Sequence, residues 1–301
     1  MKLTEVSPNL YLIPLDQDIT GFTDFIGAWL YKGEKAFLVD VGPAATVPIL
    51  INVLNTLGVR HLDAILLTHI HIDHAGGIGD LLNQFPETPV ICHGSAIKHL
   101  QDPTRLWEGS LKALRQTART YGPIKPVPRN LLFDADDFSD YGIASILTPG
   151  HSPHHVSYQF GPFLFAGEAG GVFVDLSNQE FYLRPATPPR FFLETNIQSI
   201  DILLKSEHDM LCYGHFGMTR KTPQVLKAHR QQILTWADLI QREMMENQGD
   251  ERVERCMARL LAEDPLLAGW HRLGPAIQER ERFFLHNSIN GFLQYLEADE
   301  G

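Results

Sequence analysis

Four predicted strands of this chain end on a histidine or a glutamate, and this recurrence constrains the fold more than any other feature. Each is a short apolar run of strand length, bounded by turn residues. The four runs are DAILLTH, ASILTPGH, FLFAGE and DMLCYGH, which end at His69, His151, Glu168 and His215. Loops after strand ends are where α/β proteins assemble their sites. The pattern therefore predicts an α/β fold with a site built at the ends of several strands.

The turn after the first of these strands, THIHIDHAGG, is dense in metal-ligand side chains. It carries His69, His71, Asp73 and His74 within six positions. Imidazole and carboxylate groups suit zinc, iron or manganese, and no cysteine accompanies them, which argues against a structural cysteine-rich zinc site. Histidines also occur at helix starts without binding anything. Four ligand types directly after a strand are hard to obtain in that way, so the turn predicts a metal site.

The turn resembles the HxHxDH signature of the metallo-β-lactamase superfamily, and four further motifs appear in the family's order. FLVDVG resembles the family's LVDxG strand, with Asp40 behind the ligands. TPGHS places His151 at the third histidine, and FAGE resembles the family's FxGD, with Glu168 at the acidic position. CYGH places His215 at the last ligand. The resemblance covers about residues 8 to 217.

The resemblance implies a four-layer αβ/βα sandwich with the site at one edge of the two sheets. It also implies two divalent metal ions, zinc in the first place, with iron or manganese as alternatives. The hydroxide that two such metals share would attack the substrate, and Asp73 would be both a ligand and the group that orients this nucleophile. The implied ligands are His69, His71 and His151 for one metal, Asp73, His74 and His215 for the other, and Glu168 between them.

Two positions depart from the family pattern. Glu168 has the charge and donor atoms of the usual aspartate but one more methylene, so bridging, ligation of one metal, and a hydrogen bond to water are the alternatives. The stretch HSPHH carries His154 and His155 where the family often has Gly-His. His155 matches the family's histidine and is expected to support catalysis by orienting a ligand. His154 is a candidate substrate contact, with an exposed loop residue as the alternative.

The segment after Glu168, NQEFYLRPATPPRFF, supplies further candidate substrate contacts. An arginine at Arg184 or Arg190 would hold a substrate carboxylate, and Tyr182 would donate to an oxyanion. For each arginine, a surface ion pair is the alternative interpretation.

Two helical segments are predicted as additions to the sandwich. The catalytic domain is expected over residues 1–220, with a helical insertion at about 95–129 in which Leu106, Leu111 and Leu114 recur at helical spacing. A C-terminal helical region is expected over 221–301. Its first helix is marked by Thr222 and Pro223, which favour a helix start. These helices would supply the contact of a homodimer.

Charge and composition narrow the class of partner. The net charge of −11 argues against binding to a phosphate backbone, which depends on clustered Lys and Arg. No apolar stretch reaches the length of a membrane span, and the N-terminus lacks the pattern of a signal peptide. Three cysteines without CxxC spacing fit a reducing compartment. We therefore expect a cytoplasmic protein with a small-molecule substrate and with neither a nucleic-acid nor a membrane partner.

The leading interpretation is hydrolysis of an ester-like bond in a small, acidic substrate, either a thioester, as in glyoxalase II, or a lactone. Both classes carry similar histidine turns. β-Lactam hydrolysis is disfavoured because such enzymes are typically shorter and exported. The alternatives are an iron-dependent oxidoreductase of the same fold, such as a persulfide dioxygenase, a phosphodiesterase, and a non-catalytic regulatory protein. The complete ligand set argues against the last of these.

Overall fold

The computed structural model describes residues 3–176, 180–246, 249 and 251–299. Within these residues, seven strands form a first sheet in the order in which they occur along the chain. Antiparallel pairs join the first four strands, and parallel pairs join the last four. The strands are β1 (Thr4–Ser7), β2 (Leu10–Pro14), β3 (Gly27–Lys32), β4 (Ala36–Val39), β5 (Ala64–Leu66), β6 (Val90–Cys92) and β7 (Leu132–Asp134).

A second sheet has the order β14-β13-β10-β9-β8 within the described residues. It comprises β8 (Ile143–Leu147), β9 (Val156–Phe160), β10 (Phe163–Gly167), β13 (Met210–Tyr213) and β14 (Met218–Thr219). Strands β10 and β13 are parallel, so the residues that follow them, Glu168 and His215, emerge at the same edge. A separate hairpin pairs β11 (Val172–Asp175) with β12 (Phe181–Arg184).

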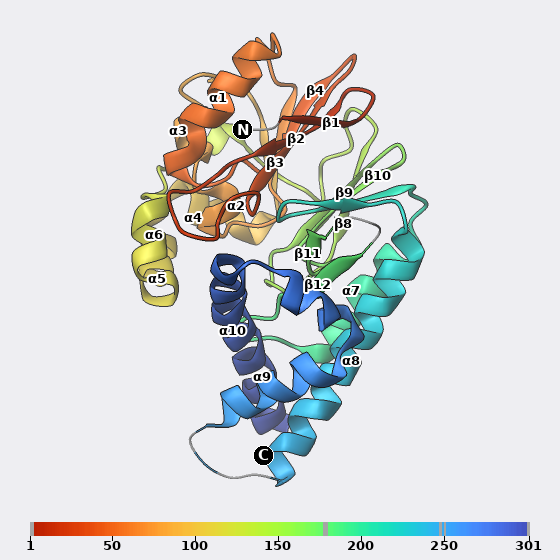
Figure 1. The fold of residues 1–301 in the computed structure, drawn as a ribbon. Helices are drawn as coiled ribbons and strands as arrows, with labels where there is room; N and C mark the ends of the chain where they lie inside the picture. The colour runs from red at the N-terminus through yellow and green to blue at the C-terminus, as the bar shows by residue number, and fades with distance from the viewer. Residues whose placement is uncertain (1–2, 177–179, 247–248, 250, 300–301) are drawn as a thin grey trace.

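The two sheets pack face to face, and helices cover their outer faces (Figure 1). Alternate residues of one strand serve different layers, because successive side chains point to opposite faces. In β4, Phe37 packs between the sheets, where Trp29 meets Phe165 with ring centroids 6.0 Å apart, whereas Leu38 packs towards the helices. In β10, Leu164 packs towards the helices in the same way. The expected four-layer αβ/βα sandwich is confirmed.

Helices flank the sheets and connect the strands. The first sheet is covered by α1 (Val47–Thr56) and α3 (Ile78–Leu81), and the second by α7 (Leu193–Leu203) and α8 (Thr222–Glu246). The predicted insertion contains α4 (Ile97–Gln101), α5 (Thr104–Leu114) and α6 (Gln116–Tyr121). Short 3-10 turns complete the framework at Ala44–Thr46, Gly94–Ala96, Arg129–Leu131 and Pro265–Arg272.

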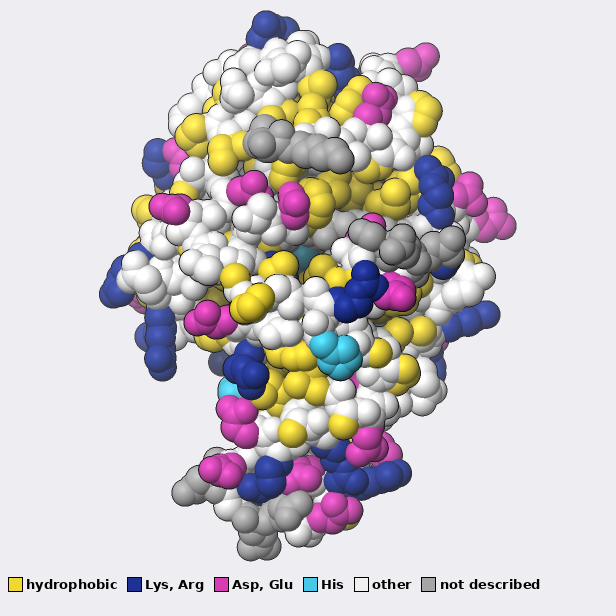
Figure 2. Space-filling model, viewed as in Figure 1, with side chains coloured by type: hydrophobic (Ala, Val, Ile, Leu, Met, Phe, Trp, Pro, Cys, Tyr) yellow, Lys and Arg dark blue, Asp and Glu magenta, His cyan; other side chains and the backbone are white. Residues whose placement is uncertain are grey.

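The C-terminal region is helical, as expected, and lies below the sandwich in Figure 1. Its helices α8, α9 (Arg252–Glu263) and α10 (Pro275–Asp299) share a core with α7. In that core the ring centroid of Phe292 lies 5.8 Å from that of Trp236 and 4.6 Å from that of Phe191. Among the described helices, none is long and apolar enough to cross a membrane. On the face in Figure 2, acidic and basic side chains are interspersed.

Candidate metal centre

A buried aspartate holds the histidine-rich turn in place. Asp40 accepts hydrogen bonds from the N–H and the hydroxyl of Thr68, both at 2.8 Å, and its Oδ2 lies 2.9 Å from His74 Nδ1. Its backbone is left-handed, with φ 57°, a conformation that a residue with a side chain keeps only where its surroundings enforce it. One strained residue therefore fixes both the end of β5 and the ring of His74.

Three imidazoles and a carboxylate form the first ligand set: His69, His71, His151 and Glu168, whose ligand atoms lie within 4.8 Å of one another. His71 Nδ1 is 3.1 Å from His69 Nε2 and 2.9 Å from His151 Nε2. A neutral imidazole carries one proton, so three ring nitrogens that face each other cannot all be satisfied by mutual hydrogen bonds. The first set therefore fits a cation at its centre.

The second ligand set is formed by Asp73, His74 and His215, from the short helix α2 (Ile72–Ala75) and the end of β13. The Asp73 carboxylate lies 3.8 Å from His74 Nε2 and 4.0 Å from His215 Nε2, too far for hydrogen bonds. His74 Nε2 is buried and has no hydrogen-bond partner among the described residues. A buried nitrogen that faces carboxylates without bonding to them also fits a divalent cation.

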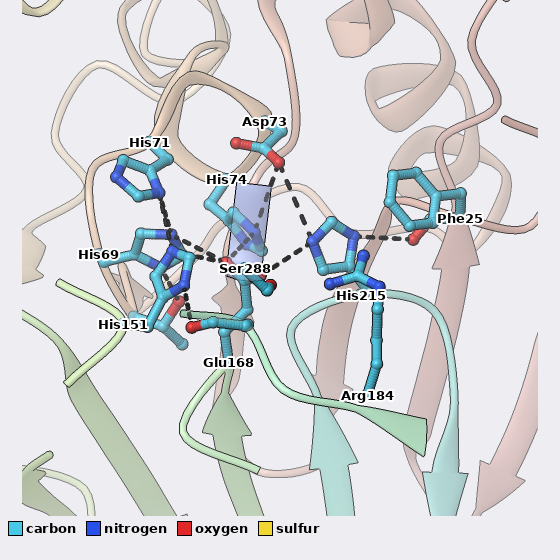
Figure 3. Close-up of polar contacts among 12 residues, drawn as sticks. Phe25, His69, His71, Asp73, His74, His151, Glu168, Arg184, His215 and Ser288 are labelled. Carbon is cyan, nitrogen blue, oxygen red and sulfur yellow. Dashed lines mark hydrogen bonds and ion pairs between the residues drawn. The ribbon is translucent and has the colours of Figure 1, made fainter. Parts of the chain in front are cut away.

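Glu168 lies between the two sets (Figure 3). Its Oε2 is 2.9 Å from His151 Nε2 and 3.5 Å from His74 Nε2, whereas its Oε1 is 3.2 Å from His215 Nε2. Each carboxylate oxygen therefore faces a histidine that the other does not. Of the three roles left open by the sequence, this geometry favours bridging.

Backbone carbonyls fix the orientation of two ligand rings. His151 Nδ1 lies 3.0 Å from the carbonyl oxygen of Ala186, and His215 Nδ1 lies 3.2 Å from that of Phe25. A carbonyl only accepts, so Nδ1 carries the proton in both rings. Nε2 of each ring is then the free nitrogen, and it is the one that faces the centre.

His155 acts on the backbone that carries Glu168. Its Nε2 accepts a hydrogen bond from the Glu168 N–H at 3.1 Å, and its Nδ1 lies 2.9 Å from the Thr148 hydroxyl. Gly167 has φ 54°, and a Cβ there would lie 2.3 Å from His155 Nε2, so the contact requires glycine. His155 is fully buried and does not line the cavity described below. It therefore holds the backbone of Glu168 from outside the cavity.

Burial and mutual charge separate the pKa values of the ligands. Burial lowers the pKa of His69 well below its ordinary value, and burial together with the neighbouring His151 lowers the pKa of His71 to about 4. Burial would raise the pKa of Glu168, but His151 and His215 hold it well below its ordinary value. Burial would lower the pKa of His74, but the Asp73 and Asp40 carboxylates raise it well above its ordinary value. Without metal, the two neighbouring carboxylates therefore favour the protonated form of His74.

Metal affinity is expected to fall as the pH falls, because an ion must displace this proton from His74. Below the raised pKa of His74, each unit of pH should weaken binding at the second set about tenfold, as displacement of one proton requires. Chelator competition with the metal-free protein between about pH 6 and pH 8 measures this slope. The first set, in which the pKa values of His69 and His71 are lowered, is the internal control. Its metal dissociation constant should change less with pH. A flat dissociation constant for the second set would contradict the assignment.

Both ligand sets open into a cavity of about 540 Å³. Residues of α5, of α10 and of the segment 184–189 form its walls. The wall residues include Leu106, Ala113, Leu114, Arg184, Phe283, Phe284 and Ser288. The walls are mainly apolar, whereas His71, Asp73, His151, Glu168 and His215 form the polar floor.

The structure brings all seven predicted metal ligands together, but it places only one of the four predicted substrate contacts in the cavity lining. Arg184 lines the cavity. Tyr182 is fully buried in the core beside Trp270, with ring centroids 6.4 Å apart, so the expectation that it contacts substrate is wrong. Arg190 is exposed and lies outside the cavity lining, so a contact between it and the substrate stays a prediction. His154 lies near His71, with ring centroids 6.4 Å apart, but is also outside that lining.

Sequence reasoning missed the contribution of α10. Phe283, Phe284 and Ser288 line the cavity, and the ring of Phe25 stacks on His215 with centroids 4.3 Å apart. The adjacent aromatic pair in ERERFF was the available signal. Its position among charged residues is equally typical of a solvated helix face.

The family model described as the Metallo-beta-lactamase superfamily matches residues 24–215. A metallo-beta-lactamase fold-containing protein of Sulfurisphaera tokodaii is 27% identical over 224 residues, which are 71% of this chain and 80% of that relative. A hydroxyacylglutathione hydrolase of Yersinia pestis is 29% identical over 165 residues, 53% of this chain and 50% of that enzyme. The chain thus matches about half the length of the second relative.

Two solved structures share the fold over most of their length. An archaeal metallo-beta-lactamase superfamily protein from Sulfolobus tokodaii superposes with a TM-score of 0.69 at 21% identity, covering 95% of this chain and 98% of that one. A metallo-beta-lactamase family protein from Thermus thermophilus superposes with a TM-score of 0.65 at 20% identity, covering 98% and 95%. At these identities the likeness concerns the fold alone.

Proposed function

Because the chain belongs to the metallo-β-lactamase superfamily, we propose that it is a metal-dependent hydrolase that cleaves an ester-like bond, a thioester or a lactone, in a small acidic substrate. The observation that carries the proposal is the Glu168 carboxylate between two ligand sets at the floor of a cavity. A function that does not involve a metal would not require so many histidine ring nitrogens that point towards one centre.

The chemistry divides between the metals and the chain. Two divalent ions, when bound, lower the pKa of water towards about 7 and polarise an acyl oxygen. Asp73 would help to hold a metal and would orient the attacking water, since its carboxylate lines the cavity and makes no hydrogen bond to His74 or His215. Asp40 and His155 keep His74 and Glu168 in position. The apolar walls limit the entry of bulk water.

Two observations support an acyl substrate with an acidic group. The hydroxyacylglutathione hydrolase of Yersinia pestis is named for a thioester substrate. Arg184, at the cavity wall, donates from Nε to the Glu281 carboxylate at 2.5 Å, and that same carboxylate accepts from Arg280. Two arginines thus share one glutamate, so this cluster of three residues carries a net charge of +1. We place the acidic group of the substrate beside Arg184 and its acyl part along α5 and α10.

Metal quantification paired with a substrate panel tests the function. The panel contains thioesters, lactones, simple esters and phosphodiesters, with acidic and neutral members of matched chain length. Hydrolysis of a thioester or lactone by protein that holds two zinc or manganese ions supports the proposal, and a preference for acidic members supports the role of Arg184. Stoichiometric iron with thiol-dependent oxygen uptake would establish the oxidoreductase instead. A metal-loaded protein that is inert across the panel would favour a regulatory role.

Filling the cavity from α5 is expected to discriminate against long acyl groups. Ala113→Phe adds a ring to the α5 wall of the cavity, so KM for a long-chain thioester should rise about tenfold, since one methylene in an apolar pocket is worth roughly 1–3 kcal/mol. KM for an acetyl thioester and the metal content should not change. Lys112→Phe is the matched control, because Lys112 is the preceding residue of α5 and lies outside the cavity lining. Equal effects of both variants on all chain lengths would contradict this placement.

A further inference from the structure

The last helix reaches the second ligand set through a stack of three side chains. The guanidinium carbon of Arg280, on α10, lies 3.9 Å from the ring centroid of Phe25. The Phe25 ring in turn stacks on His215, with centroids 4.3 Å apart and planes 23° from parallel. Figure 3 shows Phe25 beside His215, on the side away from Glu168. A cation over one aromatic ring and an imidazole stacked against the same ring are both attractive arrangements.

The backbone around Phe25 also holds His215. The Phe25 carbonyl accepts hydrogen bonds from His215 Nδ1 at 3.2 Å and from the Phe216 N–H at 2.9 Å. Ile26 forms an isolated antiparallel bridge with His215. The segment 21–26 therefore fixes both the tautomer and the tilt of this ligand. Any shift of the segment would move the ring.

Arg280 ties that segment to α10. Its Nη1 donates to the carbonyl oxygen of Gly21 at 2.6 Å, and its Nε donates to Glu281 at 2.9 Å. Gly21 has φ 85°, and a Cβ there would lie 2.3 Å from the carbonyl oxygen of Ala276, so the segment lies directly against the helix. Arg280 is only 5% exposed and Glu281 is fully buried. Buried charges of this kind persist only when they are paired and hydrogen-bonded. The contacts of Arg280 with Gly21 and Glu281 are therefore expected to be rigid.

We propose that Arg280 is a positioning residue for the second ligand set: it holds residues 21–26 against α10, and thereby fixes the Phe25 carbonyl and ring that orient His215. The inference rests on the metal centre of the proposed function, and it extends control of that centre to the C-terminal helix. Its consequence is selective. The first set contains neither His215 nor any contact with Phe25, so Arg280 governs the occupancy of one metal and not of both.

The test measures metal binding without any substrate. Full-length Arg280→Met, Arg280→Lys and wild-type protein are titrated with zinc in competition with a chromophoric chelator. Arg280→Met should weaken the second zinc about tenfold, the lower end of the effect of removing a residue that supports a ligand, and leave the first zinc unchanged. Arg280→Lys keeps a cation and a donor and should recover part of the loss. Arg282→Met is the matched control, because Arg282 is half exposed and its ion pair with Glu254 lies away from the centre.

A second variant separates positioning from stability. Phe25→Leu keeps the backbone carbonyl but removes the ring, so it should weaken the second zinc in the same way. Because both variants break one chain of contacts, the double variant should bind little worse than either single one. The absorption spectrum of cobalt at the second site should change in both. If Arg280→Met does not fold, Phe25→Leu alone decides.

Three outcomes would overturn the proposal: an unchanged second dissociation constant in Phe25→Leu, equal weakening of both zinc ions in Arg280→Met, or full additivity in the double variant. Each is independent of the reaction. A substrate panel without activity would sink the hydrolase proposal and leave this one standing, whereas unchanged zinc binding in the variants would do the reverse.

Discussion

His71→Ala is expected to lose one metal ion and to abolish turnover. The ring of His71 presents Nδ1 to both His69 and His151, at 3.1 and 2.9 Å, so its removal leaves the first ligand set without its central donor. We expect kcat/KM to fall by more than about a hundredfold, as when a single preorganised group at a reacting centre is removed. Mass spectrometry of the native protein and elemental analysis give the metal content, and the best substrate of the panel gives the rate.

His61→Ala is the matched control for this variant. Its side chain is 72% exposed, and its ion pair with Asp63 lies on the surface. It should keep both metals and full activity. Full activity in His71→Ala would refute the assignment of the first ligand set, and loss of activity with both metals retained would show that His71 acts on the substrate and not on a metal.

Glu168→Gln is expected to have the second large effect, because it removes the charge that both ligand sets share. Both oxygens of this buried carboxylate face ring nitrogens, His151 on one side and His215 on the other. An amide presents a donor to one of these nitrogens, so we expect both metals to bind more weakly and turnover to fall by more than about a hundredfold. Zinc titration and steady-state kinetics measure the two effects.

Glu168→Asp is the conservative partner of that experiment. It keeps the charge and both oxygens and shortens the side chain by one methylene. If Glu168 bridges, the variant should retain both metals and turnover within about tenfold of the wild type. A Glu168→Gln protein with two metals and normal rates would contradict bridging. The pair of variants thus separates the charge of this residue from its reach.

The ligands were predictable because each follows a strand that the local pattern reveals. An apolar run of strand length ends within four residues of His69, His151, Glu168 and His215, and the parallel pairing of β10 with β13 brings Glu168 and His215 to one edge. The sequence predicted that His155 orients a ligand, but not which one. Its partner, the Glu168 N–H, follows from the left-handed turn at Gly167, which only the structure reveals.

The substrate contacts were less predictable because they depend on what covers the hairpin of β11 and β12. Tyr182 and Arg184 are two residues apart on β12 and therefore share a face, yet one is buried beside Trp270 and the other lines the cavity. The difference comes from α10 and the turn Pro265–Arg272, about a hundred residues further along the chain. Likewise, Arg280 and Glu281 belong to a charged helical stretch, and a single sequence does not show that their partners lie at Gly21 and Arg184.

The candidate ligands come from both sheets, so the metal centre lies between the half of the molecule built on the first sheet and the half built on the second. His69, His71, Asp73 and His74 follow a strand of the first sheet, whereas His151, Glu168 and His215 follow strands of the second. Neither half holds a complete set. A change in the apolar layer between the sheets, at Phe165 for example, that spreads them by a fraction of an ångström would loosen the ions without touching a ligand. Bound ions, in turn, would hold the two sheets together, so metal binding and the packing of the sheets would be coupled.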